Sequence, residues 1–349
     1  MTALLSVRDL KQHFQLGGGF LRKKYRVYAV DGITFDLKQG ETLGLVGESG
    51  CGKSTLGRTL LKLFEPTAGQ ISFEGRDITH LSPREMRSLR QEMQIVFQDP
   101  AESLNSRHTV GQILEEPFII HGKGNTEQRR AWVLELLDKV GLPKSAVDRY
   151  PHEFSGGQRQ RIGIARAIAL KPKLLICDEA VSALDVSVQS QIINLLLSLQ
   201  REMNLAIIFI AHDLSVVKHI SDRIAVMYLG RIVELAEAQS LYLAPRHPYT
   251  QALISAIPVP DPRRRNQRIL LTGDVPSPIS PPSGCHFHQR CPYATDLCRH
   301  TAPSLHICDG AAHQVACHFP PGGGGGCAPG KGDMMPVSAS QQSGTGDKQ

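Results

Sequence analysis

The sequence predicts an α/β fold built around a parallel β-sheet, and three observations favour this class. A glycine-rich loop, Gly47–Thr55, stands between the apolar run Thr42–Val46 and a segment of helical pattern. Further short apolar runs, such as Ala206–Ala211, have the composition of strands that are buried on both faces. The acidic pair Asp178–Glu179 ends one such run, and the carboxyl end of a strand is where a parallel sheet holds its ligand.

The glycine-rich loop matches the pattern G-x-x-x-x-G-K-[ST], which cradles phosphate groups when a strand precedes it and a helix follows. Glycines allow backbone N–H groups to point inward, and the start of the helix adds a partial positive charge. Lys53 would reach the terminal phosphates of a nucleotide, and the Ser54 hydroxyl would bind Mg²⁺. The alternative, a glycine-rich turn with a surface lysine, does not explain the flanking patterns. The predicted nucleotide-binding residues of the loop are Gly47, Glu48, Ser49, Gly50, Cys51, Gly52, Lys53, Ser54 and Thr55.

Size and composition limit the classes of protein to consider. The chain has 349 residues, of which 41% are apolar, so we expect a full core plus an appendage. No run approaches the roughly 18 apolar residues of a membrane-spanning helix. The N-terminus has no basic-then-apolar leader, so a cytoplasmic chain is expected. The net charge of +6 is modest and scattered, which predicts no nucleic-acid partner.

The residues before the phosphate loop predict strands. Leu4–Leu16 alternates and is expected to be one strand, while Gly32–Leu37 and Glu41–Val46 are expected to form a hairpin that leads into the loop. An aromatic ring placed here would stack on an adenine base. Phe14 is the candidate and Tyr28 the alternative, and either ring could instead belong to the core.

A second anion-binding segment follows later in the chain. After the short strand Gln94–Gln98 and a helical region from Thr109 to Gly141, the residues Ser155, Gly156, Gly157 and Gln158 open another helix. A serine and two glycines at a helix start form a nest for an anion. One phosphate site does not need two cradles, so we expect the second to serve the nucleotide of another subunit.

Three side chains at strand ends suggest hydrolytic chemistry. Asp178 would hold Mg²⁺, and Glu179 would polarise the attacking water as a general base. His212 follows the strand predicted at Ala206–Ile210 and would contact the γ-phosphate at the same edge of the sheet. The helix Ser187–Met203 has one apolar face and is expected to pack rather than react.

The last hundred residues differ in composition from the rest. Prolines mark an irregular extension after Pro245, and four cysteines follow at intervals of five, six and eighteen residues: Cys285, Cys291, Cys298 and Cys317. No C-x-x-C pair is present, so the common zinc pattern is not met, whereas four thiolates can hold an iron–sulfur cluster at looser spacing. Zinc, or no metal, remains the alternative. The tail 321–349 is predicted to be disordered, with Cys327 incidental.

In this order, the glycine-rich loop, Gln98, Ser155–Gln158, Asp178–Glu179 and His212 make the chain resemble the ATP-binding cassette (ABC) ATPases. The resemblance implies a RecA-like P-loop core, an antiparallel β subdomain and an inserted helical subdomain at about residues 99–162. It assigns the loop as Walker A, Gln98 as the Q-loop, Ser155–Gln158 as the signature and His212 as the switch histidine. Family members act as head-to-tail dimers, with ATP between the Walker A loop of one subunit and the signature of the other.

Several stretches look more specifically like the dipeptide/oligopeptide importer ATPases, and within them like the second ATPase, usually given the suffix F. They are Ala29–Gly32, Gly47–Gly52, Ser182–Val186, Arg246–Thr250 and the four-cysteine region. The resemblance implies an ABC ATPase domain at 1–243, a Pro/Cys-rich C-terminal domain at 244–320 and a tail at 321–349. The implied cofactors are ATP, Mg²⁺ and a [4Fe–4S] cluster on the four cysteines.

The same resemblance implies how the protein would work. Glu179 and His212 would be catalytic, and Ser54, Gln98 and Asp178 would hold Mg²⁺ while ATP hydrolysis drives peptide import. The implied partners are a paralogous ATPase as heterodimer, two transmembrane permease subunits and, indirectly, a substrate-binding protein. The expected location is the cytoplasmic face of the bacterial plasma membrane, as a peripheral subunit.

Alternatives and departures remain at this stage. The cargo could be nickel, glutathione or another peptide-like solute, because other subunits select it. A cassette protein acting on DNA or ribosomes is disfavoured, since this chain has one cassette and no long coiled-coil insertion. Ala180 and Ser106 each stand where the family usually has proline, and Cys308 has no role in the family pattern.

Overall fold

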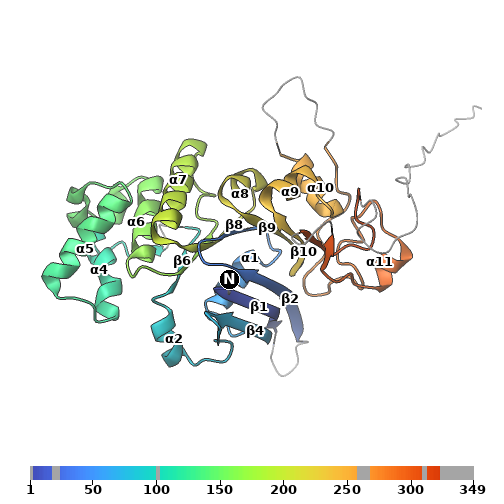
Figure 1. Cartoon of the computed structure of the whole chain (residues 1–349), viewed down its shortest axis with the longest axis horizontal. Coiled ribbons are helices and arrows are strands. Elements are labelled where there is room, and N and C mark those ends of the chain that lie inside the picture. Colours follow the sequence, from blue (N-terminus) through green and yellow to red (C-terminus); the bar gives the residue numbers. More distant parts are fainter. Residues whose placement is uncertain (1–2, 18–23, 100–102, 258–267, 309–312, 323–349) are drawn as a thin grey trace, which may run out of the picture.

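The computed structural model describes residues 3–17, 24–99, 103–257, 268–308 and 313–322. They form two β-sheets, a helical lobe at one end and an irregular C-terminal region at the other (Figure 1). The predicted tail lies outside the described residues from position 323 onward, as does Cys327.

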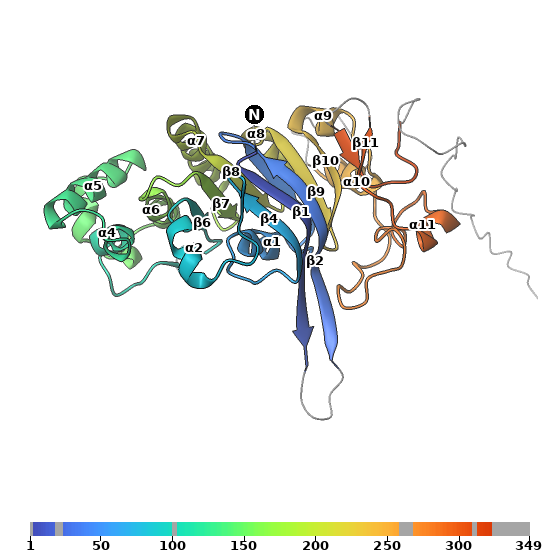
Figure 2. The same cartoon turned by 60° about the horizontal axis from the view of Figure 1, so that its bottom comes forward.

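The smaller sheet is antiparallel, with strand order β2-β1-β4-β5. Its strands are β1 (Leu5–Leu16), β2 (Tyr25–Leu37), β4 (Ala68–Phe73) and β5 (Arg76–Asp77). The alternating apolar residues Leu5, Val7 and Leu10 of β1 are fully buried, so one face of the sheet covers the core. The far ends of β1 and β2 project from the body as a two-stranded ribbon (Figure 2).

The larger sheet has eight strands in the order β11-β12-β10-β9-β3-β8-β7-β6. The parallel strands are β3 (Thr42–Val46), β6 (Met93–Val96), β7 (Leu174–Asp178), β8 (Ala206–Ala211) and β9 (Arg223–Tyr228). Every residue of β3, β7 and β8 is buried, as expected for strands covered on both faces. This arrangement confirms the predicted α/β class.

One predicted hairpin is wrong. β2 belongs to the small sheet, whereas β3 lies in the large sheet between β8 and β9, parallel to both. The turn at Lys38–Gly40 therefore passes the chain from one sheet to the other. The physical reason is that β3 is apolar on both faces and needs a central position, while β2 has one polar face. The hairpin of β9 with β10 (Arg231–Glu237) is confirmed.

Helices cover the large sheet and build the lobe at one end. The first are α1 (Lys53–Leu60), which starts at the phosphate loop, and α2 (Pro83–Leu89). The lobe contains α4 (Val110–Ile120), α5 (Thr126–Lys139), two 3-10 helices (Lys144–Asp148 and Pro151–Glu153) and α6 (Gly156–Ile168) (Figure 1). Next along the chain come α7 (Val186–Met203) and α8 (Leu214–Ile220). Capping boxes begin α2, α4, α5 and α6, which explains why these helices start where they do.

The C-terminal region joins the core sheet. It contains α9 (Ala238–Leu243), α10 (Pro248–Ser255), α11 (Asp296–His300), β11 (His306–Cys308) and β12 (His313–Val315). β12 pairs with β10, with Glu234 opposite Val315, so this region extends the larger sheet. Within the described part of the chain, no helix has both the length and the apolar character needed to cross a bilayer.

Candidate nucleotide-binding site

The phosphate loop joins the end of β3 to the start of α1, as the motif predicts. Gly52 caps α1 in the left-handed region at φ 105°, and a Cβ there would lie 1.9 Å from the carbonyl oxygen of Ala29. Gly50 has φ 79°, and a Cβ built on it would meet nothing within 4 Å. The loop is thus packed closely at Gly52 and open at Gly50, where a phosphate can approach the backbone.

The Lys53 side chain folds back against the phosphate loop. Its Nζ donates to the carbonyl oxygens of Gly47 at 2.7 Å and Glu48 at 3.1 Å, and the residue is only 4% exposed. No carboxylate pairs with this ammonium group among the described residues. A buried cation without a counter-ion is costly, so the site favours an anion such as a phosphate.

Ser54 and Asp178 come together as a Mg²⁺ site requires. The Ser54 hydroxyl donates to Oδ1 of Asp178 at 2.6 Å, although the two residues are 124 positions apart in the chain. Asp178 is 1% exposed, its Oδ2 accepts no hydrogen bond, and the Arg58 guanidinium lies 3.7 Å from that oxygen. A half-buried hydroxyl and a buried carboxylate with an unused oxygen are ligands of the kind that Mg²⁺ binds.

Glu179 lies beside Gln98 and His212. Gln98 donates from Nε2 to Oε2 of Glu179 at 2.9 Å, and Nδ1 of His212 lies 3.9 Å from the same oxygen. The structure thus places Gln98 against the predicted base rather than on Asp178. Glu179 has a positive φ of 49°, and Ser182 stabilises this strained turn with two hydrogen bonds to the Glu179 carbonyl oxygen. Ala180, which follows, is buried and leaves both acids in place.

Most of these groups line one cavity of about 380 Å³, whereas Asp178 and His212 are not among its lining residues. Its walls include Ser49, Gly50 and Gly52–Thr55 of the loop, together with Gln98 and Glu179. Phe14 also lines the cavity, whereas Tyr28 does not and instead packs against the His13 ring at 4.6 Å. The geometry therefore favours Phe14 over Tyr28 as the base-stacking candidate.

Sequence reasoning missed Pro278 in this wall, along with Val27 and Ala29. Pro278 belongs to the proline-rich extension, and its carbonyl oxygen accepts a hydrogen bond of 2.9 Å from the backbone N–H of Tyr28. No motif marks it, because an irregular segment carries no periodicity that would indicate its neighbours.

The Ser155–Gln158 segment does not reach this cavity. Ser155 caps α6, and its hydroxyl accepts from the Gln158 backbone at 3.3 Å. Gly157 is needed for packing, since a Cβ there would lie 2.4 Å from Val188 of α7. The second cradle is therefore formed, but it is not directed at the nucleotide cavity of its own chain.

The four cysteines of the C-terminal region gather close to one another. Burial, followed by the neighbouring thiols of Cys285 and Cys298, raises the pKa of Cys291 to about 12. The pKa of Cys317 is likewise raised to about 12 by burial and by the same group of thiols. All four are free thiols. Among the residues described, no three His, Cys, Asp or Glu side chains surround a point that could hold a single metal ion. The geometry supports neither the zinc alternative nor the iron–sulfur cluster, and the cluster stays a prediction.

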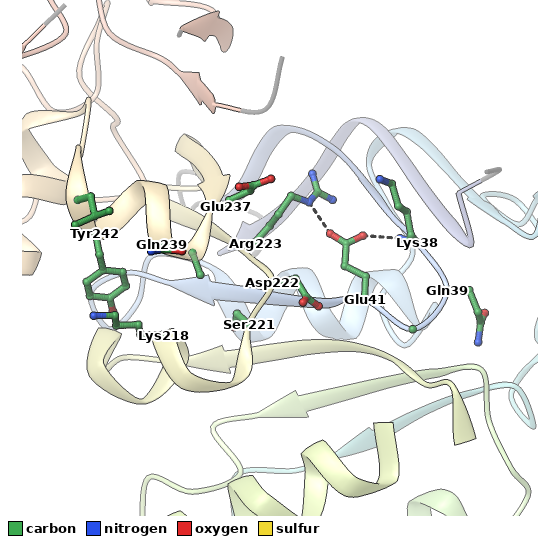
Figure 3. Close-up of a pocket in the computed structure, with 13 residues that line it drawn as sticks. Lys38, Gln39, Glu41, Lys218, Ser221, Asp222, Arg223, Glu237, Gln239 and Tyr242 are labelled. Carbon is green, nitrogen blue, oxygen red and sulfur yellow. Dashed lines mark hydrogen bonds and ion pairs between the residues drawn. The ribbon is translucent and has the colours of Figure 1, made fainter. Parts of the chain in front are cut away.

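A larger hollow of about 900 Å³ lies at the other edge of the sheet, where β3 and β9 begin (Figure 3). Three of its charged groups, Glu41, Asp222 and Arg223, are engaged in structural contacts. Arg223 donates to Glu41 at 2.5 Å, and Asp222 accepts from the Thr42 backbone at 2.8 Å. Because its polar groups hold the sheet together, we place the chemistry in the smaller cavity.

Comparison with known proteins agrees with this site. Residues 30–182 match the family model for ABC transporters, and residues 233–298 match the model for the C-terminal region of oligopeptide/dipeptide transporters. The chain is 55% identical over 320 residues to the oligopeptide transport ATP-binding protein AppF of Bacillus subtilis, covering 90% of this chain and 97% of that protein. It is 55% identical over 318 residues to the probable peptide ABC transporter ATP-binding protein y4tS of Sinorhizobium fredii, covering 90% of each.

Solved structures show the same fold. CbiO1 of Clostridium perfringens, part of an ABC transporter complex, superimposes with a TM-score of 0.60 at 29% identity, over 69% of this chain and 91% of that one. The ATP-binding cassette MJ0796, in a dimeric structure bound to ADP and Pi, also gives a TM-score of 0.60, at 27% identity, over 67% of this chain and 98% of that one. Together with the identity to AppF over nine-tenths of the chain, these matches show that the protein belongs to the oligopeptide-transporter branch of the ABC ATP-binding proteins.

Proposed function

We propose that this chain is the ATP-hydrolysing subunit of an importer for di- or oligopeptides. The observation that carries the proposal is the convergence of Lys53, Ser54, Asp178 and Glu179 at one edge of the sheet. The printed names of its relatives, which are oligopeptide or peptide transport ATP-binding proteins, supply the cargo class.

The residues divide the work of hydrolysis. Lys53 would bind the terminal phosphates, and Phe14 would stack on the base. Ser54 and Asp178 would hold Mg²⁺, which neutralises charge on the phosphates when it is bound. Glu179 would orient and deprotonate the attacking water, with Gln98 and His212 on its carboxylate to set its position.

We further infer that two such ATPase subunits pair head to tail. The phosphate loop lines the cavity while Ser155–Gln158 lies away from it, so the second cradle is available to a partner's nucleotide. The relative MJ0796 forms a dimer in a structure with ADP and Pi. The partner would be a paralogous ATPase, which makes the assembly a heterodimer.

The pair would act on two transmembrane permease subunits at the cytoplasmic face of the plasma membrane. The segment after Gln98 would transmit the ATP cycle to them, and Ser106, within that segment, is exposed. The chain itself would be peripheral. A substrate-binding protein outside the membrane would deliver the cargo to the permeases.

Reconstitution tests this function directly. The chain, its paralogue and their permeases are placed in liposomes with the binding protein, and uptake of a labelled tripeptide, Ni²⁺ or glutathione is measured. We expect ATP-dependent uptake of the peptide. Uptake of Ni²⁺ or glutathione alone would replace the cargo, and absence of ATPase activity in every preparation would reject the enzymatic role.

We also propose that Cys285, Cys291, Cys298 and Cys317 hold a [4Fe–4S] cluster. Four neighbouring free thiols, of which burial and the adjacent thiols raise the pKa of Cys285, Cys291 and Cys317, form a soft ligand set of the size that such a cluster uses. When bound, the cluster would tie the irregular C-terminal region together. Iron and zinc analysis after anaerobic purification, with a visible spectrum, tests this. About four irons per chain are expected, whereas a Cys298→Ser variant with unchanged iron content would reject the site.

A further inference from the structure

The C-terminal region holds the phosphate loop through a partly buried ion pair. Arg290 donates from both terminal nitrogens to the Glu48 carboxylate, at 2.8 and 3.1 Å, across 242 residues of sequence. The Arg290 side chain is 8% exposed and that of Glu48 is 27% exposed. A two-pronged pair of this kind fixes orientation as well as distance. Glu48 stands at a variable position of the phosphate-loop pattern, so the motif itself assigns it no specific contact.

The backbone of Glu48 is held from the same side. Its N–H donates to the hydroxyl of Tyr249 at 2.9 Å, while its carbonyl oxygen accepts from Lys53 at 3.1 Å. The residue gripped by Arg290 and Tyr249 is thus one of the two whose carbonyl groups orient the phosphate-binding lysine. Any rotation of the Glu48 peptide would move the Lys53 ammonium group with it.

An aromatic cluster makes this support rigid. The Phe287 ring lies 5.3 Å from that of Tyr228 and 5.5 Å from that of Tyr249, and the Arg290 guanidinium lies 5.9 Å from the Tyr228 ring. Tyr228 and Tyr249 are fully buried. Phe287 and Arg290 come from the cysteine-rich segment, so that segment docks directly beneath the loop.

We propose that Arg290 is a positioning residue for ATP, through which the C-terminal region keeps the phosphate loop in its binding geometry. The inference rests on the proposed ATPase function. Without Arg290, the phosphate loop would adopt several conformations, and only chains whose loop keeps the binding geometry would bind ATP. The apparent affinity for ATP would then fall in proportion to the fraction of such chains. The contact touches neither Glu179 nor the attacking water, so turnover at saturating ATP is preserved.

The test compares ATP binding with turnover in the full-length chain. Arg290→Ala is expected to raise the ATP dissociation constant and KM by about tenfold, because loss of a partly buried, two-pronged pair costs on the order of the 1.4 kcal/mol that a tenfold change requires. The kcat at saturating ATP should change less than about twofold. Arg290→Lys, which keeps the charge and loses the fork, should be intermediate. Arg299→Ala is the matched control, since that arginine lies in the same region in an exposed pair with Asp296.

A double-mutant cycle with Glu48→Gln shows whether the effect passes through the ion pair. We expect the double variant to bind ATP about as weakly as Arg290→Ala alone, because each change breaks the same contact. Additive effects on affinity, or an Arg290→Ala variant that melts earlier but binds ATP like the unaltered chain, would overturn the proposal. If the unaltered chain does not bind ATP, the proposed function fails instead, and the melting curves of the variants separate that outcome from unfolding.

Discussion

The phosphate loop and the Ser155–Gln158 segment both begin a helix with glycines, but their surroundings differ. The phosphate loop is held from several directions: Gly52 packs on Ala29, and the carbonyl oxygen of Cys51 accepts from Gly230 at 2.9 Å. Arg290 and Tyr249 grip it from the C-terminal region. The second segment relies on its own capping box and on the contact of Gly157 with Val188.

We attribute this difference to two roles: the phosphate loop would bind the nucleotide, and the Ser155–Gln158 segment would serve in the pairing of two chains. The phosphate loop is held from several directions, so its backbone groups are already oriented and a single chain can bind a nucleotide. The Ser155–Gln158 helix start does not line the nucleotide cavity of its own chain, and in the proposed dimer a second chain would supply its anion. The next three predictions test this contrast, from the largest effect to the smallest, and a fourth tests the stability of the C-terminal region.

Glu179→Gln should abolish turnover while leaving both cradles intact. Removal of a general base lowers the rate by about 10²- to 10⁴-fold, and the amide keeps the size of the carboxylate. ATP binding should persist, and the trapped ATP should stabilise the dimer. Single-turnover ATPase assays and light scattering with ATP measure the two effects. Hydrolysis at the unaltered rate would show that another group is the base.

Phe14→Ala should weaken ATP binding at the phosphate-loop side only. Loss of base stacking costs about 1–3 kcal/mol, which is a rise of roughly 5- to 150-fold in the dissociation constant. The matched control is Tyr28→Ala, because Tyr28 pairs with His13, the neighbour of Phe14 on β1, and its ring lies outside the cavity. Equal losses in the two variants, measured by ATP titration, would show that the strand rather than the ring matters.

Ser155→Ala should act only in the assembled pair. Loss of this helix cap costs about 1 kcal/mol of stability, and loss of the hydroxyl should reduce the ATPase rate several-fold. Binding of ATP to the isolated chain should stay within experimental error of the unaltered protein. A weaker ATP affinity in the monomer would place the segment in the same chain's site and remove the contrast drawn above.

Acid should lower the stability of the protein through His247 in the C-terminal region. Burial lowers the pKa of His247 from 6.5 to about 4, although the nearby Glu234 opposes this. The folded form therefore binds fewer protons than the unfolded form between these values, and stability falls as the pH drops through this window. The expected loss is about 2 kcal/mol between pH 7 and pH 5.

His247→Asn tests that assignment. Nδ1 of His247 accepts from the Tyr249 backbone at 3.1 Å, and an asparagine oxygen can replace it as the helix cap. Urea unfolding at the two pH values should show a smaller difference in the variant. An unchanged pH dependence in the variant would show that the loss of stability does not come from His247.

Much of this could be predicted from the sequence, because the decisive patterns are local. The wholly apolar runs of β3, β7 and β8 indicate buried parallel strands, and the order of Lys53, Asp178 and His212 locates the site. The supposed hairpin at 32–46 failed because adjacency along the chain does not reveal that two strands belong to different sheets.

The contacts of Pro278 and Arg290 could not be predicted for a related reason. Both residues lie in irregular chain, and Arg290 meets Glu48 from 242 positions away. Tyr249 lies in the Arg246–Thr250 stretch, which supports the resemblance to the importer ATPases. Nothing in that stretch indicates that Tyr249 contacts the phosphate loop.

The pairing of β12 with β10 determines which strand forms the exposed edge of the larger sheet. Without β12, the seven-residue β10 would present unpaired N–H and C=O groups along the sheet's margin, a template on which another chain could add a strand. With β12 and β11 in place, the margin is a strand of three residues, His306–Cys308. The C-terminal region thereby also protects the cassette against edge-to-edge aggregation.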